Sequence, residues 1–412
     1  MDYGCIGQRL SHSFSKNIHE SIGRYSYELK ELELAELPAF IESRQYRGLN
    51  VTIPYKQAVI PYLDELSERA SRIGAVNIIL NRGGRLYGDN TDFGGMLALL
   101  GRMGLEVEGK KALVLGTGGT SRTVCAVLES LGAGETVRVS RSADRQDAVT
   151  YEQACKLHKD ADIIINTTPC GMFPHTHEQP IALECFPNLC GVVDAVYNPL
   201  RSRLVLQARE RGIPAAGGLY MLVKQAVMAA ELFTDLPLTE EQTQGVYNRL
   251  LAERQNLVLI GMPGCGKTAV GRLLAQELDR ELIDVDELIV AQAGRPISEI
   301  FADDGEDRFR QLETEAIADI AGKNGLIIAT GGGAVLNEEN TVNLSQNGKL
   351  ILLDRPLELL LPTSDRPLAD NEEKMRRLYR ERRSLYQKAA DQIVKAEDPP
   401  ETVARSIIRS MV

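Results

Sequence analysis

The chain has 412 residues, of which 43% are hydrophobic and 25% are charged, and its net charge is −10. These proportions are ordinary for globular proteins, and the acidic balance argues against nucleic acid or a membrane surface as partners, because both require a basic face. The apolar runs fall far short of the roughly 20 residues of a membrane span, and the first residues do not resemble a signal peptide. The seven cysteines include no C-x-x-C pair, so we expect a cytoplasmic protein with reduced thiols and two or three domains.

The first 250 residues alternate between predicted strands and helices. Residues 1–93 contain short elements interrupted by Gly and Pro, and a helix is predicted to begin near Met96. The strands predicted beyond it are Lys111–Leu115, Thr136–Ser140, Asp162–Asn166, Val192–Asp194 and a strand at Ile213. Later helices are predicted over Leu204–Arg211 and Met221–Phe233. This alternation indicates a doubly wound nucleotide-binding domain, assigned to 94–217, while 1–93 and 218–250 are predicted to form a substrate-binding domain.

A second series of strands and helices follows the charged helical stretch Leu238–Gln255, whose last residues, 251–255, are assigned as a connector. The new domain is assigned to 256–412, and its predicted strands are Leu257–Ile260, Glu281–Asp284, Leu326–Thr330 and Leu350–Leu353. Strands rich in Val, Ile and Leu are typical of parallel sheets with helices on both faces. The predicted fold class is therefore α/β for the whole chain.

A glycine-rich turn follows the strand Lys111–Leu115 and precedes a helix, which is the setting of a dinucleotide-binding turn. The residues of this turn are Gly116, Gly118, Gly119 and Thr120. A site that prefers NAD carries an acidic residue at the end of the next strand, to bind the ribose hydroxyls. Here that strand ends at Ser140 and is followed by Arg141 and Arg145, which favours a 2′-phosphate and therefore NADP(H). The alternative is that both arginines are exposed loop charges.

The second glycine turn, 261–268, matches G-x-x-x-x-G-K-[ST] between a strand and a helix, as a mononucleotide P-loop requires. Its backbone N–H groups would face phosphate oxygens, because the glycines permit the turn and the helix N-terminus adds positive potential. The ammonium of Lys267 would reach the β- and γ-phosphates, and the hydroxyl of Thr268 would hold Mg²⁺. The residues expected to bind ATP are Gly261, Gly264, Cys265, Gly266, Lys267 and Thr268.

The first 250 residues resemble shikimate dehydrogenase. The resemblance rests on the stretches GQRLSHSFSKNIH at 7–19, GLNVTIPYK at 48–56, GAVN at 74–77, GDNTDFGG at 88–95 and GGLYMLVKQA at 217–226. It implies that Lys56 and Asp92 are catalytic. The residues it implies for substrate binding are Ser13, Ser15, Asn50, Thr52, Asn77 and Gln225. One departure is Lys16, which stands where the family usually has proline.

The second half resembles shikimate kinase over essentially all of 256–412. The motifs are DVDELI at 284–289, SEIFADDGEDRFRQLE at 298–313, GGG at 331–333, RPL at 366–368 and RRSLY at 382–386. The resemblance implies that Asp284 helps to bind Mg²⁺ and that Lys267, Asp286 and Arg366 take part in phosphoryl transfer. The residues implied for substrate binding are Asp286, Arg310, Gly331, Gly332, Gly333 and Arg382. The segment before Arg366 is short and has no basic residue at 358–365, so the resemblance does not settle how efficiently a lid would close there.

Together the two resemblances imply a two-domain dehydrogenase followed by a P-loop kinase, acting on consecutive small molecules. The first half would reduce 3-dehydroshikimate to shikimate with NADPH, and the second would phosphorylate shikimate with ATP and Mg²⁺. Three alternatives stay open. The first half could instead act on quinate with NAD, one half could bind without turnover, or the second half could be a different small-molecule kinase. Oligomeric state is left open by the sequence.

Overall fold

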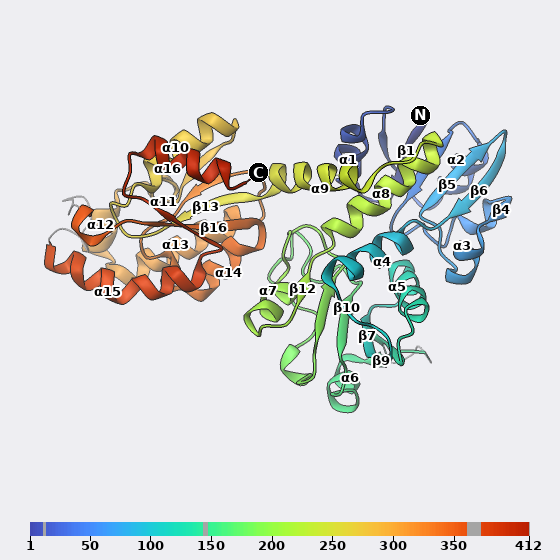
Figure 1. Cartoon of the computed structure of the whole chain (residues 1–412), viewed down its shortest axis with the longest axis horizontal. Helices are drawn as coiled ribbons and strands as arrows, with labels where there is room; N and C mark the ends of the chain where they lie inside the picture. The colour runs from blue at the N-terminus through green and yellow to red at the C-terminus, as the bar shows by residue number, and fades with distance from the viewer. Residues whose placement is uncertain (11–13, 143–146, 361–371, 412) are drawn as a thin grey trace. The chain divides into compact units, whose positions relative to one another are not determined.

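The computed structural model describes residues 1–10, 14–142, 147–360 and 372–411 (Figure 1). It divides into two compact units, Met1–Leu250 and Leu251–Val412. Residues 251–254, expected as part of a connector, continue the helix α9, Glu240–Arg254. Within the described ranges, no helix combines the length and apolar character needed to cross a bilayer.

The first sheet of the first unit is mixed. Its strand order is β2-β1-β3-β5-β6-β4, with β1 pairing in parallel with β2 and β3, and β5 antiparallel to β3 and β6. The strands are β1 (Tyr3–Gly7), β2 (Glu28–Glu31), β3 (Gly48–Val51), β4 (Glu65–Leu66), β5 (Ile78–Arg82) and β6 (Arg85–Asp89). The helices that accompany it are α1 (Ser15–Ile22), α2 (Leu37–Glu42), α3 (Glu68–Ile73) and α8 (Leu219–Thr234). Every residue of β1 and β3 is buried, which makes them the centre of this sheet.

The second sheet is parallel and doubly wound, as the alternation of strands and helices predicted. Its order is β12-β11-β10-β7-β8-β9, with strands β7 (Lys111–Leu115), β8 (Glu135–Ser140), β9 (Val149–Thr150), β10 (Ile163–Asn166), β11 (Gly191–Asp194) and β12 (Ala215–Ala216). Its helices are α4 (Asp92–Met103), α5 (Gly119–Ser130), α6 (Tyr151–Leu157) and α7 (Arg203–Glu210). The strand expected at Ile213 is wrong by two residues, because the ladder to β11 starts only at the Pro214 carbonyl.

The third sheet fills the second unit and is also parallel, in the order β14-β15-β13-β16-β17. Its strands are β13 (Asn256–Ile260), β14 (Leu282–Asp284), β15 (Ile327–Ala329), β16 (Gly348–Asp354) and β17 (Gln392–Lys395). The helices are α10 (Lys267–Leu278), α11 (Val285–Ala293), α12 (Ile297–Asp303), α13 (Gly305–Ala321), α14 (Glu338–Asn347), α15 (Glu372–Ala389) and α16 (Pro400–Arg409). In Figure 1, α10 and α16 lie on one side of the strands, and α13, α14 and α15 lie on the other. The fully buried β13 therefore has helices over both faces.

Both glycine turns follow the strand at which the strand order reverses. In the second sheet β7 lies between β10 and β8, and in the third sheet β13 lies between β15 and β16. In open parallel sheets, ligands bind beyond the carboxyl ends of the strands at this switch point, where the loops on either side diverge. The topology thus places one candidate nucleotide site in each unit.

Packing between α4 and α8 depends on a glycine, and this gives a testable prediction. A β-carbon at Gly95 would lie 2.7 Å from the carbonyl oxygen of Met221 on α8, whereas one at Gly101 of the same helix meets nothing within 4 Å. We expect Gly95→Ala to destabilise the first unit by about 1–3 kcal/mol through overpacking. Gly101→Ala should stabilise it by roughly 0.5–1 kcal/mol, because alanine is the better helix former.

Thermal unfolding of the two alanine variants beside the parent chain measures this difference. Equal shifts of the melting temperature in both variants would contradict the role of Gly95 in holding α4 against α8.

Candidate active sites

The first candidate site is centred on a buried ion pair. Lys56 lies in the turn after β3, and Asp92 is the first residue of α4. Their side chains meet with Nζ 2.5 Å from Oδ2 and are only 13% and 8% exposed. Ion pairs on the surface usually add little to stability. Charged groups that are largely excluded from water are instead typical of functional sites. The structure therefore brings together the two residues that the sequence predicted as catalytic.

A hydrogen-bonded group of neutral side chains surrounds Asn77. The Nδ2 of Asn77 donates to Thr91 Oγ1 at 3.0 Å and to Gln225 Oε1 at 3.3 Å, while its Oδ1 accepts from the Thr91 backbone N–H at 2.7 Å. Asn50, in β3, donates from Nδ2 to the Asn77 carbonyl oxygen at 3.4 Å. Asn50, Asn77 and Gln225 are each less than 10% exposed. Three predicted substrate-binding residues from different elements thus share one cluster.

The remaining predicted substrate residues of this unit are described less completely. Ser15 begins α1 and is half-buried. Thr52 follows β3, its backbone N–H donates to the Ile6 carbonyl at 3.0 Å, and its methyl group leaves no room for a side chain at Gly7. Ser13 lies outside the described residues.

The first glycine turn is fitted closely to its surroundings. Gly116 has φ of 109°, which favours glycine, and a β-carbon there would lie 2.8 Å from Thr167 Oγ1. Gly118 caps α5 and Gly119 begins it, so the helix N-terminus faces the turn, with Thr120 half-buried in its first turn. A β-carbon at Gly119 would lie 3.3 Å from Lys56 Cβ. A cofactor in this turn would therefore lie next to the Lys56–Asp92 pair, and the bare backbone and helix dipole fit a pyrophosphate.

Sequence reasoning missed a residue that closes this turn. Ser121 is fully buried, and its hydroxyl donates to the Gly116 carbonyl at 2.7 Å. The serine could have been noted from its place in the turn. At the end of β8, Ser140 is half-buried and Arg141 is exposed, as a ribose-phosphate contact requires, while Arg145 lies outside the described residues.

Asp194 anchors the loop that packs against the first glycine turn. Its carboxylate accepts from Ser202 Oγ at 2.5 Å, Asn166 Nδ2 at 2.9 Å and the Val196 backbone N–H at 3.0 Å. Asn166 Oδ1 in turn accepts from the Thr168 backbone N–H and hydroxyl. Complete burial raises the pKa of Asp194 to about 6, although these hydrogen bonds oppose the rise.

The P-loop in the second unit has the geometry expected of a phosphate site. Positive φ values at Gly261, Gly264 and Gly266 turn the backbone between β13 and α10. Lys267 is 7% exposed, and its Nζ donates to the Gly261 and Met262 carbonyls at 2.9 and 3.1 Å. Cys265, 1% exposed, lies with its sulfur 3.8 Å from the same ammonium.

Two further side chains at this loop suit a divalent cation. The Thr268 hydroxyl donates to Asp284 Oδ2 at 2.7 Å, and Asp284 also accepts from the Asp286 backbone N–H at 3.1 Å. A hydroxyl and a carboxylate beside a phosphate loop are the oxygen ligands that Mg²⁺ takes, together with phosphate and water. The residues present therefore fit ATP with Mg²⁺.

The predicted substrate residues of the second unit gather around the three glycines at 331–333. A β-carbon at Gly331 would lie 2.9 Å from Asp286 Oδ1, and one at Gly333 would overlap the Arg310 guanidinium. Arg382, 5% exposed, donates to the Gly332 carbonyl at 2.8 Å. Two guanidinium groups and a carboxylate thus border one glycine tripeptide, a combination that suits a molecule with both a carboxylate and hydroxyls. Arg366 lies outside the described residues.

Glu313 is a residue whose contribution sequence reasoning did not assign. It is 0% exposed, and its Oε2 lies 3.1 Å from Arg310 NH1 while Oε1 has no hydrogen-bond partner within the described residues. Burial raises the pKa of Glu313, and Arg310 opposes that rise. The i,i+3 spacing on α13 was the available signal for a carboxylate that orients Arg310. Tyr386, whose hydroxyl donates to the Gly332 carbonyl, was missed as well.

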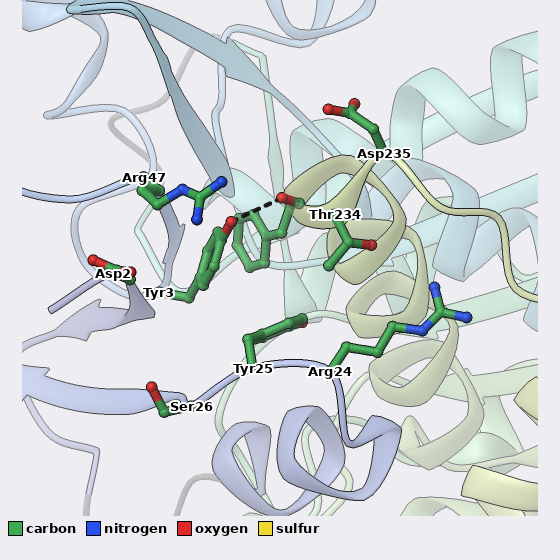
Figure 2. A pocket seen from close by; sticks show the side chains of 9 residues that line it. Asp2, Tyr3, Arg24, Tyr25, Ser26, Arg47, Thr234 and Asp235 are labelled. Atoms are coloured by element: carbon green, nitrogen blue, oxygen red, sulfur yellow. Dashed lines mark hydrogen bonds between the residues drawn. The ribbon is translucent and has the colours of Figure 1, made fainter.

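A surface cavity of about 420 Å³ lies elsewhere in the first unit, lined by Asp2, Tyr3, Arg24, Tyr25, Ser26, Arg47, Phe233, Thr234 and Asp235 (Figure 2). None of the predicted site residues lines it. Its walls are mainly charged and polar side chains near the start of β1 and β3 and the end of α8, and the Tyr3 hydroxyl already donates to the Phe233 carbonyl at 3.0 Å. The chemistry therefore centres on the clusters described above rather than on this cavity.

Known proteins resemble both units. A family model for the shikimate dehydrogenase substrate binding domain matches residues 5–79, and a shikimate kinase model matches 263–412. A shikimate dehydrogenase (NADP(+)) from Clostridium beijerinckii is 37% identical over 262 residues, which cover 60% of this chain and 96% of the relative.

Two solved structures show the fold of the first unit. Shikimate 5-dehydrogenase from Thermus thermophilus in complex with NADP(H) and shikimate has 34% identity and a TM-score of 0.54, covering 60% of this chain and 99% of that one. A quinate dehydrogenase from Corynebacterium glutamicum in complex with NAD has 27% identity and a TM-score of 0.53, covering 60% and 98%.

The buried Asp194 predicts an unusual dependence of stability on pH. Because its pKa is about 6 when folded and 3.8 ordinarily, the folded state binds more protons between about pH 4 and pH 6, and this group's contribution to stability falls as pH rises through that window. Asp194→Asn removes the effect. Between pH 5 and pH 7.5 we expect the melting temperature of the variant to rise relative to the parent by about 2–4 °C.

Ser202→Ala is the matched control, since it keeps the carboxylate but removes a hydrogen bond that lowers its pKa. Its melting temperature should fall further than that of the parent over the same pH range. A pH-independent difference between parent and Asp194→Asn would show that Asp194 does not titrate in this window.

Proposed function

The chain belongs to the shikimate dehydrogenase family and carries a shikimate kinase domain, and from this premise we propose that it catalyses two consecutive reactions. The first unit reduces 3-dehydroshikimate to shikimate with NADPH, and the second transfers a phosphoryl group from ATP to the 3-hydroxyl of shikimate. It is an enzyme of the shikimate pathway whose families use NADP and ATP with Mg²⁺. The observation that carries the proposal is the presence of a cluster of charged side chains beside each glycine turn.

In the first reaction, NADPH supplies the hydride when bound. Lys56 donates a proton from Nζ to the carbonyl oxygen as negative charge develops there, and Asp92 keeps the ammonium charged and relays the replacement proton. The 2.5 Å pair supports this role because both groups are nearly excluded from water. Asn50, Asn77 and Gln225 bind the ring hydroxyls, and Ser13, Ser15 and Thr52 bind the rest of the substrate.

In the second reaction, ATP supplies the phosphoryl group. Asp286 accepts the proton of the attacking hydroxyl, while Arg310 and Arg382 bind the substrate carboxylate with Glu313 orienting Arg310. Lys267 and Arg366 neutralise charge on the transferring group, and Thr268 with Asp284 holds Mg²⁺. Phosphoryl transfer needs mainly positioning and charge neutralisation, which is what this set of residues offers.

The choice of cofactor in the first unit rests on the end of β8. No acidic side chain occurs from Ser140 to Ser142, and Arg141 is exposed beyond the strand. NADP(H) is therefore proposed over NAD. The alternative is a quinate dehydrogenase that uses NAD, because one structural neighbour is a quinate dehydrogenase in complex with NAD. Steady-state kinetics with both substrates and both cofactors separates the two.

The whole proposal is tested by one assay of the purified chain with 3-dehydroshikimate, NADPH and ATP–Mg²⁺, following NADPH loss and ADP release separately. Both signals are expected. NADPH loss without ADP release on shikimate would leave the second unit inactive or acting on another molecule, which was the open alternative for this half.

Lys56→Ala tests the proton donor. The variant should lower the turnover of 3-dehydroshikimate by about 10²–10⁴-fold, the usual contribution of a general acid. Binding of NADPH, measured by its fluorescence, should change little because the lysine donates to substrate. Normal turnover in this variant would remove Lys56 from the mechanism.

Lys267→Ala is the reciprocal change in the second unit. It should abolish ADP release on shikimate, since the P-loop ammonium reaches the transferring phosphates, and it should leave NADPH-dependent reduction unchanged. Lys56→Ala should in turn keep full kinase activity. Loss of both activities in either variant would mean that the two units depend on each other for folding.

A further inference from the structure

Tyr27 lies behind the substrate-binding cluster of the first unit. It is 2% exposed, and its hydroxyl donates to Asn50 Oδ1 at 2.7 Å. Asn50 itself is 6% exposed and joins the cluster through its contact with Asn77. The sequence did not predict a part for Tyr27 in the reaction. The residue lies just before β2, outside the recognised motifs, and 23 residues from Asn50.

The orientation of the Asn50 amide follows from its two neighbours. The Asn77 carbonyl oxygen can only accept, so the Nδ2 end of Asn50 must face it. The Oδ1 end then faces the Tyr27 hydroxyl, which donates. An amide nitrogen carries two hydrogens, and the contact with Asn77 uses one of them. The second hydrogen remains for another acceptor, and a substrate oxygen would compete for it with the ring of His19, which also interacts with the Asn50 side chain.

Tyr27 is itself held in place by a ring stack. His19 is 0% exposed, and its ring lies 4.0 Å from that of Tyr27 at an angle of 9°. The Nδ1 of His19 lies 2.6 Å from the hydroxyl of Tyr25, a residue that lines the separate cavity in Figure 2. Burial lowers the pKa of His19 to about 3, although a hydrogen bond with the Asn50 side chain opposes this fall, so the ring is neutral at physiological pH and adds no charge beside Tyr27.

We propose that Tyr27 is a positioning residue of the first unit: its hydroxyl fixes the Asn50 amide so that Nδ2 donates to a hydroxyl oxygen of the substrate ring. This inference rests on the proposed dehydrogenase function. It adds that substrate affinity depends on Tyr27, a residue that does not itself contact the substrate. Without the Tyr27 hydroxyl, the buried Oδ1 loses its donor, and the amide can rotate to find another.

Tyr27→Phe removes only the hydroxyl. We expect the KM for 3-dehydroshikimate to rise roughly tenfold, because a buried acceptor is left without its donor. The value of kcat should change less than about twofold, and the KM for NADPH should stay the same, since Tyr27 acts through a substrate-binding side chain. Tyr46→Phe is the matched control, because Tyr46 is also buried in this lobe but its hydroxyl donates to the Ile41 carbonyl at 3.0 Å.

A double-mutant cycle with Asn50→Ala separates positioning from a general loss of structure. If Tyr27 acts through Asn50, Tyr27→Phe has no further effect on KM in the Asn50→Ala background. Additive effects, or an equal rise of KM in Tyr46→Phe, would overturn the inference while leaving the proposed function intact. A parent chain that does not reduce 3-dehydroshikimate would instead overturn the proposed function, and this inference with it.

Discussion

A β-carbon at Gly119 would lie 3.3 Å from Lys56 Cβ, one at Gly331 would lie 2.9 Å from Asp286 Oδ1, and one at Gly333 would overlap the Arg310 guanidinium. In both units, side chains proposed for chemistry thus lie directly against the backbone of a glycine. A parallel sheet brings several loops to one edge, and the space there is small. Glycine lets the main chain approach the charged side chains closely, so a nucleotide bound along that backbone would lie within reach of them.

Close approach has an electrostatic consequence that differs between the two sites. In the first unit the ion pair of Lys56 with Asp92 accompanies a network of neutral amides and hydroxyls around Asn77, whose partner Thr91 directly precedes Asp92 in the chain. In the second, Arg310 lies between Glu306 and Glu313. Reduction of a ketone requires one proton at one oxygen, whereas phosphoryl transfer involves several negative charges together. The distribution of charge in each unit suits the reaction proposed for it.

Much of the fold could be predicted from the sequence, because parallel strands with both faces buried form short runs of Val, Ile and Leu. β7, β10 and β13 are of this kind. The strand β12 was misplaced because it has only two residues, both alanine, and its position is set by pairing with β11 rather than by any local pattern. The first helix of the nucleotide lobe starts at Asp92 rather than near Met96, since Gly94 and Gly95 are poor helix formers and obscured its first turn.

The residues of the candidate sites also fall into two groups, those that the sequence predicted and those that it did not. Residues within recognisable motifs, such as Lys56 and Lys267, were predicted, and the structure brings Lys56 onto its predicted partner Asp92. The contact between Asn77 and Gln225 joins residues 148 positions apart, and that between Tyr27 and Asn50 depends on how two strands lie beside β1. Such contacts are created by tertiary packing, and a single sequence carries no local signal for them.

Every residue proposed for the dehydrogenase falls before Leu250, and every residue proposed for the kinase falls after it. Each proposed reaction therefore takes all of its residues from one unit. Under the proposed function, the link would keep the two enzymes of consecutive steps at equal amounts, and tethering would raise the effective concentration of each for the other. The size of that advantage would depend on how fast the second unit captures shikimate relative to its diffusion away, and therefore on the kinase rate rather than on any residue of the dehydrogenase site.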